Sequence, residues 1–336
     1  MPCTFNTFTS VTVAGGGSWG TALAHLLVMH GLSATLWLRD RAVADAVNSR
    51  HENPRYLPGL PLHPDLRAST DPAVLSDRLL VLAVPCQQLR SWLETHRCFL
   101  HPEVVLVNAA KGLETDSHAR CSTIVAQTLE GMSARYTVLS GPSFAAEVIR
   151  GLPAAVVLAT KDETLGRILR KLFSGPTFRC YSSTDVTGVE MGGALKNVIA
   201  IAAGLCDGLQ LGHNSRAALI TRGLAEISRL GVACGAQQAT FMGLSGLGDL
   251  TLTCTGDLSR NRQVGLGLAQ GLSLSEITSR LGMVAEGIKT TAAVHELAGQ
   301  LGIEAPITAA MQHIFHEGQA PGEALRQLMG RDLRQE

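Results

Sequence analysis

In the first half of the chain, short apolar runs alternate with segments in which apolar residues recur at helical spacing. The run 79–84 (LLVLAV) is apolar without interruption, as is typical of a parallel strand covered on both faces. The pattern predicts strands near 11–13, 34–38, 66–69, 79–84, 104–108, 136–140, 154–159 and 177–181, and helices at 21–27, 41–48, 87–96, 118–129 and 163–172. Strands that alternate with helices in this way indicate a doubly wound, largely parallel sheet.

A different pattern begins near Gly188. The β-branched runs disappear, and Ala, Leu and Gly recur at the spacing of helices over 188–204, 215–230, 258–270, 273–281, 287–301, 305–314 and 321–328. We therefore expect an α/β protein with an N-terminal Rossmann-type domain in residues 1–187 and an all-α domain in residues 188–336. A chain of 336 residues, 46% of them hydrophobic, is long enough to bury two cores.

The segment 11–27 (VTVAGGGSWGTALAHLL) passes from a strand through a glycine turn into a helix. Gly15, Gly17 and Gly20 have the G-x-G-x-x-G spacing of dinucleotide-binding turns, in which the second glycine lets the backbone approach a pyrophosphate. The N–H groups of Ser18, Trp19 and Gly20 would face the phosphates, assisted by the helix dipole. An ordinary glycine-rich turn can have the same spacing, so the motif alone is weakly specific.

The predicted strand 34–38 ends in Arg39-Asp40-Arg41, about 20 residues past the last glycine, where Rossmann proteins contact the adenosine ribose. A carboxylate there binds the free 2′-hydroxyl of NADH, whereas a guanidinium favours the 2′-phosphate of NADPH. Since both groups are present, we expect use of NAD and NADP, with NADPH preferred because a guanidinium–phosphate contact is charge-assisted and stronger than a neutral one. The alternative is a solvated helix start with no role in binding.

Charge and cysteine content exclude several classes of protein. Lys plus Arg equal Asp plus Glu at 28 each, which argues against binding to nucleic acid. The 8 cysteines are scattered without a C-x-x-C, which argues against a zinc site or a disulfide framework and for a reducing cytoplasm. Residues 1–10 lack the features of a signal peptide, and we expect no apolar segment near the ~20 residues that span a bilayer. We predict a cytoplasmic protein without a metal site.

Two lysines stand out as candidates for proton transfer or charge stabilisation. Lys111 follows the predicted strand 104–108, and Lys196 lies in a strongly apolar helix with Gly192 and Gly193 one turn before it. The glycines suggest that space beside Lys196 is kept for a ligand. A lysine partly stripped of water has a lowered pKa and exchanges protons near neutral pH. The alternative is a lysine whose ammonium reaches solvent along an apolar surface.

Two further motifs in the second half carry polar groups. Gly246-Leu247-Gly248-Asp249-Leu250 places a carboxylate in an apolar, glycine-rich turn, where Asp249 would orient an ammonium or simply cap a helix. Ser259, Arg260 and Asn261 supply a hydroxyl, a guanidinium and an amide, all of which bind phosphate oxygens, although a solvated helix start uses the same residues. Neither a Ser/His/Asp motif nor a HExxH motif is present, which leaves redox chemistry with an organic cofactor.

These motifs together resemble the bacterial NAD(P)-dependent sn-glycerol-3-phosphate dehydrogenases, in the same order from about Val11 to Leu328. The matching segments are GGGSWGTALA at 15–24, KGLE at 111–114, GPSFA at 141–145, GALKN at 193–197, GLGDL at 246–250 with Thr253-Cys254, and SRNR at 259–262. One departure is Gly16, where the family usually has alanine. The family's fold is of the 6-phosphogluconate-dehydrogenase-like type.

The resemblance implies reversible reduction of dihydroxyacetone phosphate, a phosphorylated three-carbon substrate, to sn-glycerol 3-phosphate for phospholipid synthesis. It implies catalytic roles for Lys196, as general acid/base, and for Asp249. The substrate positions are Lys111, Gly141, Ser143, Lys196, Asp249, Ser259, Arg260 and Asn261. The cofactor positions are Gly15, Gly17, Ser18, Trp19, Gly20, Arg39, Lys111, Ala145, Arg260, Val284 and Glu286.

Three alternatives share the glycine turn. A β-hydroxyacid or ketopantoate-type dehydrogenase would act on carboxylates rather than phosphates. A non-catalytic dinucleotide sensor would bind NADPH and a partner protein, and retention of Lys196 and Asp249 argues against it. A methyltransferase is disfavoured by the Arg39-Asp40-Arg41 motif. The pattern leaves the oligomeric state open, with a homodimer as one option.

Overall fold

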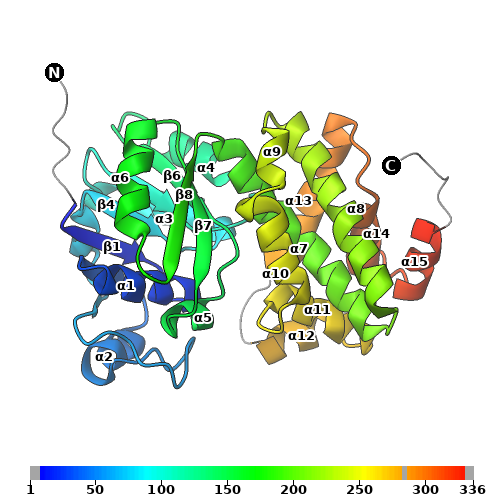
Figure 1. Ribbon diagram of the computed structural model, residues 1–336, viewed down its shortest axis with the longest axis horizontal. Coiled ribbons are helices and arrows are strands. Elements are labelled where there is room, and N and C mark those ends of the chain that lie inside the picture. Colours follow the sequence, from blue (N-terminus) through cyan, green and yellow to red (C-terminus); the bar gives the residue numbers. More distant parts are fainter. Residues whose placement is uncertain (1–7, 282–285, 330–336) are drawn as a thin grey trace. The chain divides into compact units, whose positions relative to one another are not determined.

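The computed structural model describes residues 8–281 and 286–329, and it divides into two compact units (Figure 1). The first contains residues 1–110 and 121–186, and the second contains residues 111–120 and 187–336. The sequence analysis had assigned residues 111–120 to the first domain. That assignment is wrong because Leu113, 1% exposed, is part of the second core, and Arg120 Nη1 lies 2.7 Å from Glu190 Oε2.

The first unit is built on an eight-stranded sheet with the order β3-β2-β1-β4-β5-β6-β7-β8. The pairs are parallel except for β6 with β7, which confirms the predicted, largely parallel sheet. Six strands follow the Rossmann order 3-2-1-4-5-6. The strands are β1 (Ser10–Ala14), β2 (Ser33–Trp37), β3 (Arg67–Ser69), β4 (Leu79–Leu82), β5 (Val105–Asn108), β6 (Arg135–Ser140), β7 (Ala154–Ala159) and β8 (Phe178–Ser183).

The strands at the centre of this sheet are buried on both faces. Every residue of β4 and β5 is buried, as expected of continuous apolar runs covered by helices. Helix α1 packs against β1 and β2, and α6 packs against β7 and β8. The helices of this unit are α1 (Ser18–Met29), α2 (Arg41–Arg50), α3 (Cys86–His96), α4 (Cys121–Thr128), α5 (Ala145–Ile149) and α6 (Glu163–Phe173), with 3-10 turns at Pro72–Ser76 and Arg97–Phe99.

Two differences from the expected elements concern this unit. The helix predicted from 118 begins only at Cys121, because Leu113 and Arg120 pair in an antiparallel bridge across a turn at residues 115–117. Helix α5 was not expected, since its five residues are too few to show a helical period.

The second unit is helical throughout the part that the structure describes, as predicted. Residues of the long central helix α7 form much of its core, together with residues of the surrounding helices (Figure 1). Its elements are α7 (Val186–Gly208), α8 (Gly212–Ala233), α9 (Gln238–Phe241), a π-helical turn (Leu244–Gly248), α10 (Asp249–Thr255), α11 (Arg260–Ala269), α12 (Leu274–Leu281), α13 (Glu286–Leu301), α14 (Pro306–His316) and α15 (Pro321–Met329).

Helix α7 corrects one expectation drawn from the sequence. Its 23 residues, with a mean hydropathy of 1.4 over the most apolar window, are long and apolar enough to cross a membrane. That window is 100% buried within the protein, and the core helix of a globular domain has the same length and composition. It is the one such helix among residues 8–281 and 286–329.

The segment before α10 is more regular than expected. The Gly246–Leu250 motif was interpreted as a turn, but Leu244–Gly248 forms a π-helical turn that continues directly into α10. Asp249 is therefore the first residue of a helix, and its side chain lies on the side occupied by Thr253 one turn later. π-Helical turns are frequent at functional sites.

Candidate active site

The glycine turn between β1 and α1 has three differently placed glycines. Gly15 has φ +122°, a conformation that side chains rarely adopt, and a Cβ there would lie 2.5 Å from the Ala83 oxygen. A Cβ at Gly20 would lie 1.9 Å from the Gly15 oxygen, so α1 packs directly onto the turn. A Cβ at Gly17 would meet nothing within 4 Å. The backbone at Gly17 is thus open to a ligand, while its neighbours are tightly packed.

The start of α1 fits a dinucleotide pyrophosphate. Gly17 is the N-cap, no side chain caps the helix, and its first turn holds no acidic residue. The first N–H groups of a helix have no partner within the helix and attract anions. Ser18 and Trp19 are half-buried, and Trp19 packs against the first core.

A buried asparagine that the sequence analysis missed supports this turn. The Asn53 side chain is fully buried and donates from Nδ2 to the Gly16 oxygen at 2.9 Å and to Thr21 Oγ1 at 2.8 Å. It lies in the proline-rich segment 53–65, which forms an irregular loop. No local pattern in such a loop signals a contact across 37 residues.

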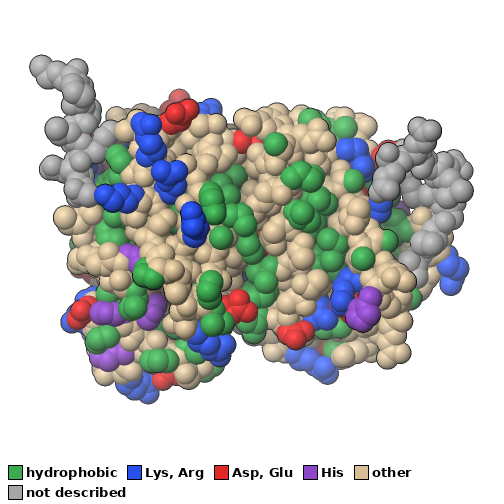
Figure 2. Space-filling view, in the orientation of Figure 1, with side chains coloured by type: hydrophobic (Ala, Val, Ile, Leu, Met, Phe, Trp, Pro, Cys, Tyr) green, Lys and Arg blue, Asp and Glu red, His purple; other side chains and the backbone are tan. Residues whose placement is uncertain are grey.

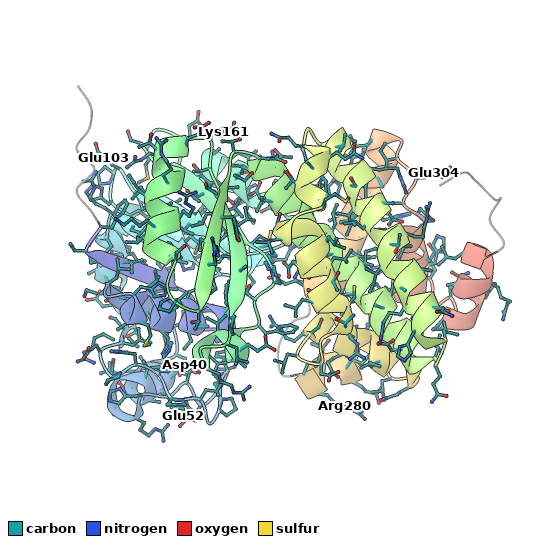
Figure 3. All side chains as sticks on the ribbon, in the orientation of Figure 1. Asp40, Glu52, Glu103, Lys161, Arg280 and Glu304 are labelled. Atoms are coloured by element: carbon teal, nitrogen blue, oxygen red, sulfur yellow. The ribbon has the colours of Figure 1, made fainter. Side chains whose placement is uncertain are left out.

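At the end of β2, Asp40 and Arg39 have different roles. Asp40, labelled in Figure 3, caps α2 by accepting from Ala42 N at 3.0 Å and from Val43 N at 3.3 Å. Its other oxygen lies 3.1 Å from Arg55 Nη1, so the carboxylate is engaged on both sides. Arg39 is exposed. Capping thus accounts for Asp40 and leaves the guanidinium groups of Arg39 and Arg41 exposed at this strand end.

Two further segments of the first unit carry residues that the resemblance assigns to binding. Gly141 and Ser143 follow β6, where Ser143 Oγ donates to the Gly141 oxygen at 3.0 Å. A Cβ at Gly141 would lie 2.9 Å from the Val156 Cα, so no larger residue fits there. Ala145 begins α5 and packs against the first core.

In the second unit, three helical side chains form a buried polar cluster. Lys196 of α7 is 6% exposed and donates from Nζ to Asp249 Oδ1 at 2.5 Å and to Thr253 Oγ1 at 2.8 Å. Thr253 Oγ1 in turn donates to the main-chain carbonyl oxygen of Asp249 at 2.6 Å. Lys196 therefore does not extend to solvent, and Asp249 does not cap a helix, which removes both alternative readings of these residues.

Lys111 completes the cluster from the segment 111–120. Its Nζ lies 2.6 Å from Asp249 Oδ2, so the two oxygens of one carboxylate each accept from a different lysine. The two ammonium groups carry one positive charge more than the carboxylate neutralises. Such a cluster suits an anionic ligand or a developing negative charge.

Burial dominates the electrostatics of this cluster. It lowers the pKa of Lys196 to about 8, although the Asp249 carboxylate acts in the opposite direction. The charge of Lys111 acts in the same direction as burial and contributes to this lowered pKa. Burial alone would raise the pKa of Asp249, but the charges of Lys111 and Lys196 outweigh it and hold that pKa below its usual value. Near neutral pH, the Lys196 ammonium is thus able to give up a proton more readily than an ordinary lysine.

The expected space beside Lys196 is not present at Gly192. A Cβ there would lie 2.6 Å from the Ser245 oxygen, so this glycine lets α7 approach the backbone of the π-helical turn. The π-helical turn precedes Asp249 directly. The glycine therefore brings the carboxylate to the lysine instead of leaving room for a ligand.

The Ser259-Arg260-Asn261 motif lies at the start of α11. Ser259 is buried and caps the helix by accepting from Arg262 N at 3.2 Å. Asn261 donates from Nδ2 to Asn197 Oδ1 at 2.9 Å and accepts from Gly287 N at 3.2 Å, so it joins α7, α11 and α13. Arg260 is exposed.

One of the last two predicted cofactor residues lies at the start of α13. Glu286 is the first residue of this helix and half-buried. Val284 lies outside the described residues. In the part of the chain that the structure describes, no group of three or more His, Cys, Asp or Glu is placed to hold a metal ion.

Comparison with known protein families identifies the family of this chain. Residues 10–166 match the N-terminal part, and residues 185–326 the C-terminal part, of the NAD-dependent glycerol-3-phosphate dehydrogenases. The chain belongs to this family. Its relative from Desulfovibrio desulfuricans, named glycerol-3-phosphate dehydrogenase (NAD(P)+), is 69% identical over 327 residues, 97% of this chain and 98% of the relative.

Solved structures place this glycerol-3-phosphate dehydrogenase family member among close and distant neighbours. The crystal structure of glycerol-3-phosphate dehydrogenase from Coxiella burnetii is 38% identical, with a TM-score of 0.91, and covers 96% of this chain and 99% of that one. A ketopantoate reductase from Ralstonia eutropha is 14% identical with a TM-score of 0.56, over 94% and 99% of the chains. The second likeness is one of fold alone, so it gives no support to the ketopantoate alternative.

For this glycerol-3-phosphate dehydrogenase family member, the structure adds residues that the sequence analysis did not assign to the site. Thr253 holds Lys196 and Asn197 holds Asn261. Thr253 follows Asp249 by four residues, so a helical reading of this segment would have placed both on one face. Asn197 is adjacent to Lys196 in the sequence, but its partner is 64 residues away.

Proposed function

We propose that this protein interconverts dihydroxyacetone phosphate and sn-glycerol 3-phosphate with NAD(P)H, and so supplies glycerol 3-phosphate for phospholipid synthesis. The observation that carries the proposal is the buried Lys196–Asp249–Lys111 cluster in a chain of this family. Reduction of a ketone produces an alkoxide, which must be stabilised and protonated. A buried lysine of lowered pKa provides both the positive charge and the proton.

The residues of the chain divide the chemistry between them. The nicotinamide cofactor, when bound, supplies the hydride that reduces the carbonyl carbon. Lys196 holds the proton that the carbonyl oxygen receives, and in the reverse direction it accepts the proton of the hydroxyl. Asp249 and Thr253 fix the direction of the Lys196 ammonium, and Lys111 keeps Asp249 ionised.

We assign the remaining predicted residues to binding. The substrate phosphate is bound by Arg260, Asn261 and Ser259, with Gly141, Ser143 and Lys111 as further substrate contacts. Since one N–H of the Asn261 amide already donates to Asn197 Oδ1, the amide binds the phosphate through its second N–H. The cofactor-binding residues are Gly15, Gly17, Ser18, Trp19, Gly20, Arg39, Lys111, Ala145, Arg260, Val284 and Glu286.

We also propose that the protein acts in the cytoplasm, as a homodimer or a monomer, without spanning a membrane. The seven cysteines in the described part of the chain all have free thiols. Charged side chains of both signs are mixed on the face seen in Figure 2. A surface of this kind lacks the field of a single sign that attracts nucleic acid.

The direct test is the rate of NADPH and NADH oxidation with dihydroxyacetone phosphate present and absent. We expect oxidation that depends on this substrate. Turnover of ketopantoate or of a β-keto acid instead would favour the carboxylate dehydrogenases. Cofactor binding without turnover of any of these substrates would favour the sensor.

The pH dependence should follow Lys196. Its pKa of about 8 means that the protonated form, which reduction requires, predominates below this pH and is lost above it. We expect kcat for reduction to fall as the pH rises through about 8, and kcat for oxidation of glycerol 3-phosphate to rise over the same range. Profiles that change in the same direction for both reactions would contradict the role of Lys196.

Replacement of Arg260 should reveal the phosphate site. In Arg260→Ala we expect kcat/KM for dihydroxyacetone phosphate to fall about ten- to hundredfold, because charge-assisted hydrogen bonds contribute about 1.5–3 kcal/mol. The rate with non-phosphorylated dihydroxyacetone should change little. Exposed Arg280, also labelled in Figure 3, gives a matched control as Arg280→Ala. Equal losses for both ketones would assign Arg260 to the cofactor or to the fold.

Replacement of Arg39 should change the choice of cofactor. In Arg39→Ala we expect kcat/KM for NADPH to fall roughly tenfold or more, since a guanidinium–phosphate contact is lost, while NADH use stays nearly constant. Arg41→Ala removes a neighbouring exposed arginine and serves as the control. An unchanged ratio between the two cofactors in Arg39→Ala would refute the assignment.

A further inference from the structure

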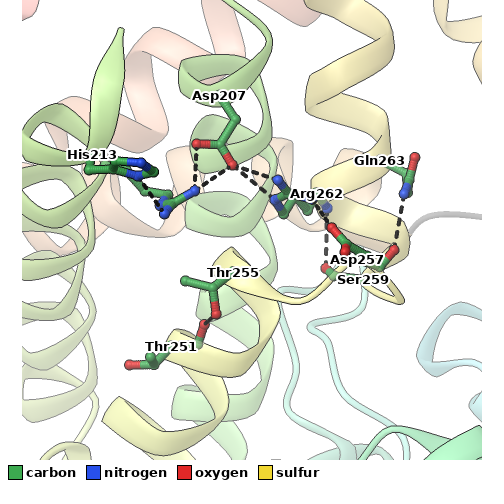
Figure 4. A network of polar contacts seen from close by, with 9 residues as sticks. Asp207, His213, Thr251, Thr255, Asp257, Ser259, Arg262 and Gln263 are labelled. Carbon is green, nitrogen blue, oxygen red and sulfur yellow. Dashed lines mark hydrogen bonds and ion pairs between the residues drawn. The ribbon is translucent and has the colours of Figure 1, made fainter. Parts of the chain in front are cut away.

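A second charged network lies near the C-terminal end of α7, within the helical unit (Figure 4). Asp207, near the end of α7, accepts from Arg262 Nε at 3.0 Å and from Arg262 Nη2 at 2.8 Å through Oδ2. Its Oδ1 accepts from Arg216 Nη1 at 2.9 Å. Arg262 Nη1 also donates to Asp257 Oδ1 at 2.9 Å. One carboxylate thus binds guanidinium groups from α8 and α11.

Arg262 lies in the first turn of α11, directly after Arg260 and Asn261. Its main-chain N–H is bound by Ser259 Oγ at 3.2 Å, and its guanidinium is bound by Asp207. The Arg262 side chain is 12% exposed and that of Asp207 14% exposed, so the pair is largely removed from water. Partly buried ion pairs with several hydrogen bonds fix geometry better than exposed ones.

The backbones of α7 and α11 also approach unusually closely at this point. A Cβ at Gly204 would lie 2.0 Å from the Arg262 oxygen, and a Cβ at Gly265 would lie 2.0 Å from the Ile201 oxygen. Neither helix can therefore shift along the other without a clash. Asn261 adds a third link through Asn197, the neighbour of Lys196.

We infer that Asp207 is a positioning residue for phosphate recognition. By holding Arg262 it fixes the first turn of α11, which carries Arg260 and Asn261. Asp207 and Lys196 lie on the same helix, α7, so this turn is held in place relative to Lys196. This inference rests on the proposed function. The phosphate and the carbonyl of a three-carbon substrate are separated by a fixed, short distance. Anchoring both binding groups to one helix lets binding of the phosphate place the carbonyl at Lys196.

Asp207 has a second effect on the charges near the site. Its carboxylate binds Arg216 and Arg262, and so directs the Arg262 guanidinium away from any anion bound at Arg260. Without it, Arg262 would compete with Arg260 for the phosphate and hold the substrate in an unproductive position. The role is therefore specific to phosphorylated ligands and differs from a general contribution to stability.

The test compares Asp207→Asn with wild type on two ketones. We expect kcat/KM for dihydroxyacetone phosphate to fall at least about tenfold, because misplacement by 1 Å costs up to about a hundredfold, whereas the rate with dihydroxyacetone should stay within about twofold. Asp207→Glu keeps the charge and should recover part of the loss. Asp257→Asn removes a bond to the same guanidinium from a 92% exposed carboxylate and should leave both rates unchanged.

Binding of inorganic phosphate, measured by calorimetry with the full-length protein, gives a readout that does not depend on turnover. We expect weaker binding in Asp207→Asn than in wild type. If Asp207→Asn does not fold, Arg262→Lys replaces it in both comparisons. Equal losses for both ketones with unchanged phosphate binding would overturn the inference. Failure of the wild type to reduce dihydroxyacetone phosphate would instead contradict the proposed function, and the phosphate arm would still test Asp207.

Discussion

Lys196→Met should fold and bind NADPH but lose turnover of dihydroxyacetone phosphate by roughly 10⁴-fold or more. Loss of a general acid contributes about 10²–10⁴, and loss of the positive charge beside the developing alkoxide adds to it. Methionine has a similar length without the charge, so the buried space stays filled. The measurement is kcat at saturating substrate, with NADPH affinity determined separately by fluorescence.

Lys161→Met is the matched control for this variant. Lys161 is exposed and lies in the turn before α6, so its replacement should leave kcat unchanged (Figure 3). A Lys196→Met protein with near-normal turnover would eliminate Lys196 as the proton donor. A protein that no longer binds NADPH would indicate that the fold, rather than the chemistry, was damaged.

Asp249→Asn should reduce kcat about 10²- to 10³-fold, more than it raises KM. The substitution leaves the buried ammonium of Lys196 and the half-buried ammonium of Lys111 next to a neutral amide, and breaking a buried ion pair costs about 3–5 kcal/mol. Without the carboxylate, the pKa of Lys196 should fall further, because burial and Lys111 both lower it. The decline of the reduction rate should therefore move to lower pH than in wild type.

The double variant Lys111→Met with Asp249→Asn provides a sharper comparison. Removing one of the two ammonium groups relieves their repulsion, so the double variant should lose less activity than the product of the two single losses. Strict multiplicativity would mean that the groups act independently, contrary to the shared carboxylate. A change confined to KM in Asp249→Asn would assign Asp249 to substrate binding alone.

Local patterns predicted the elements of this protein well because each element carries its own signal. The eight strands and the long helices were predicted from apolar periodicity, and the glycine spacing identified the turn after β1. Helix α5 and the π-helical turn before Asp249 were missed because they are too short to show a period. Local spacing was therefore enough to predict the strands and their alternation with helices.

The residues of the candidate site could be identified from the sequence, but the contacts between them could not. The sequence identified Lys111, Lys196 and Asp249 as unusual in their surroundings, and the resemblance gave them roles. Their mutual contacts join positions 138 and 53 residues apart, and no periodicity reports on such distances. The interpretation of Gly192 failed for the same reason, since its neighbour Ser245 belongs to another part of the chain.

The segment 111–120 limits how this protein can be recombined with its relatives. It leaves the chain of the first unit after β5, contributes Leu113 and Lys111 to the second unit, and returns at Cys121. A chimera with its crossover at residue 187 would therefore take residues 111–120 from one parent and the second-unit residues that contact them, such as Glu190, from the other. A crossover at residue 187 thus divides the second compact unit between the parents, whereas an exchange that keeps residues 111–120 with the C-terminal half leaves this unit whole.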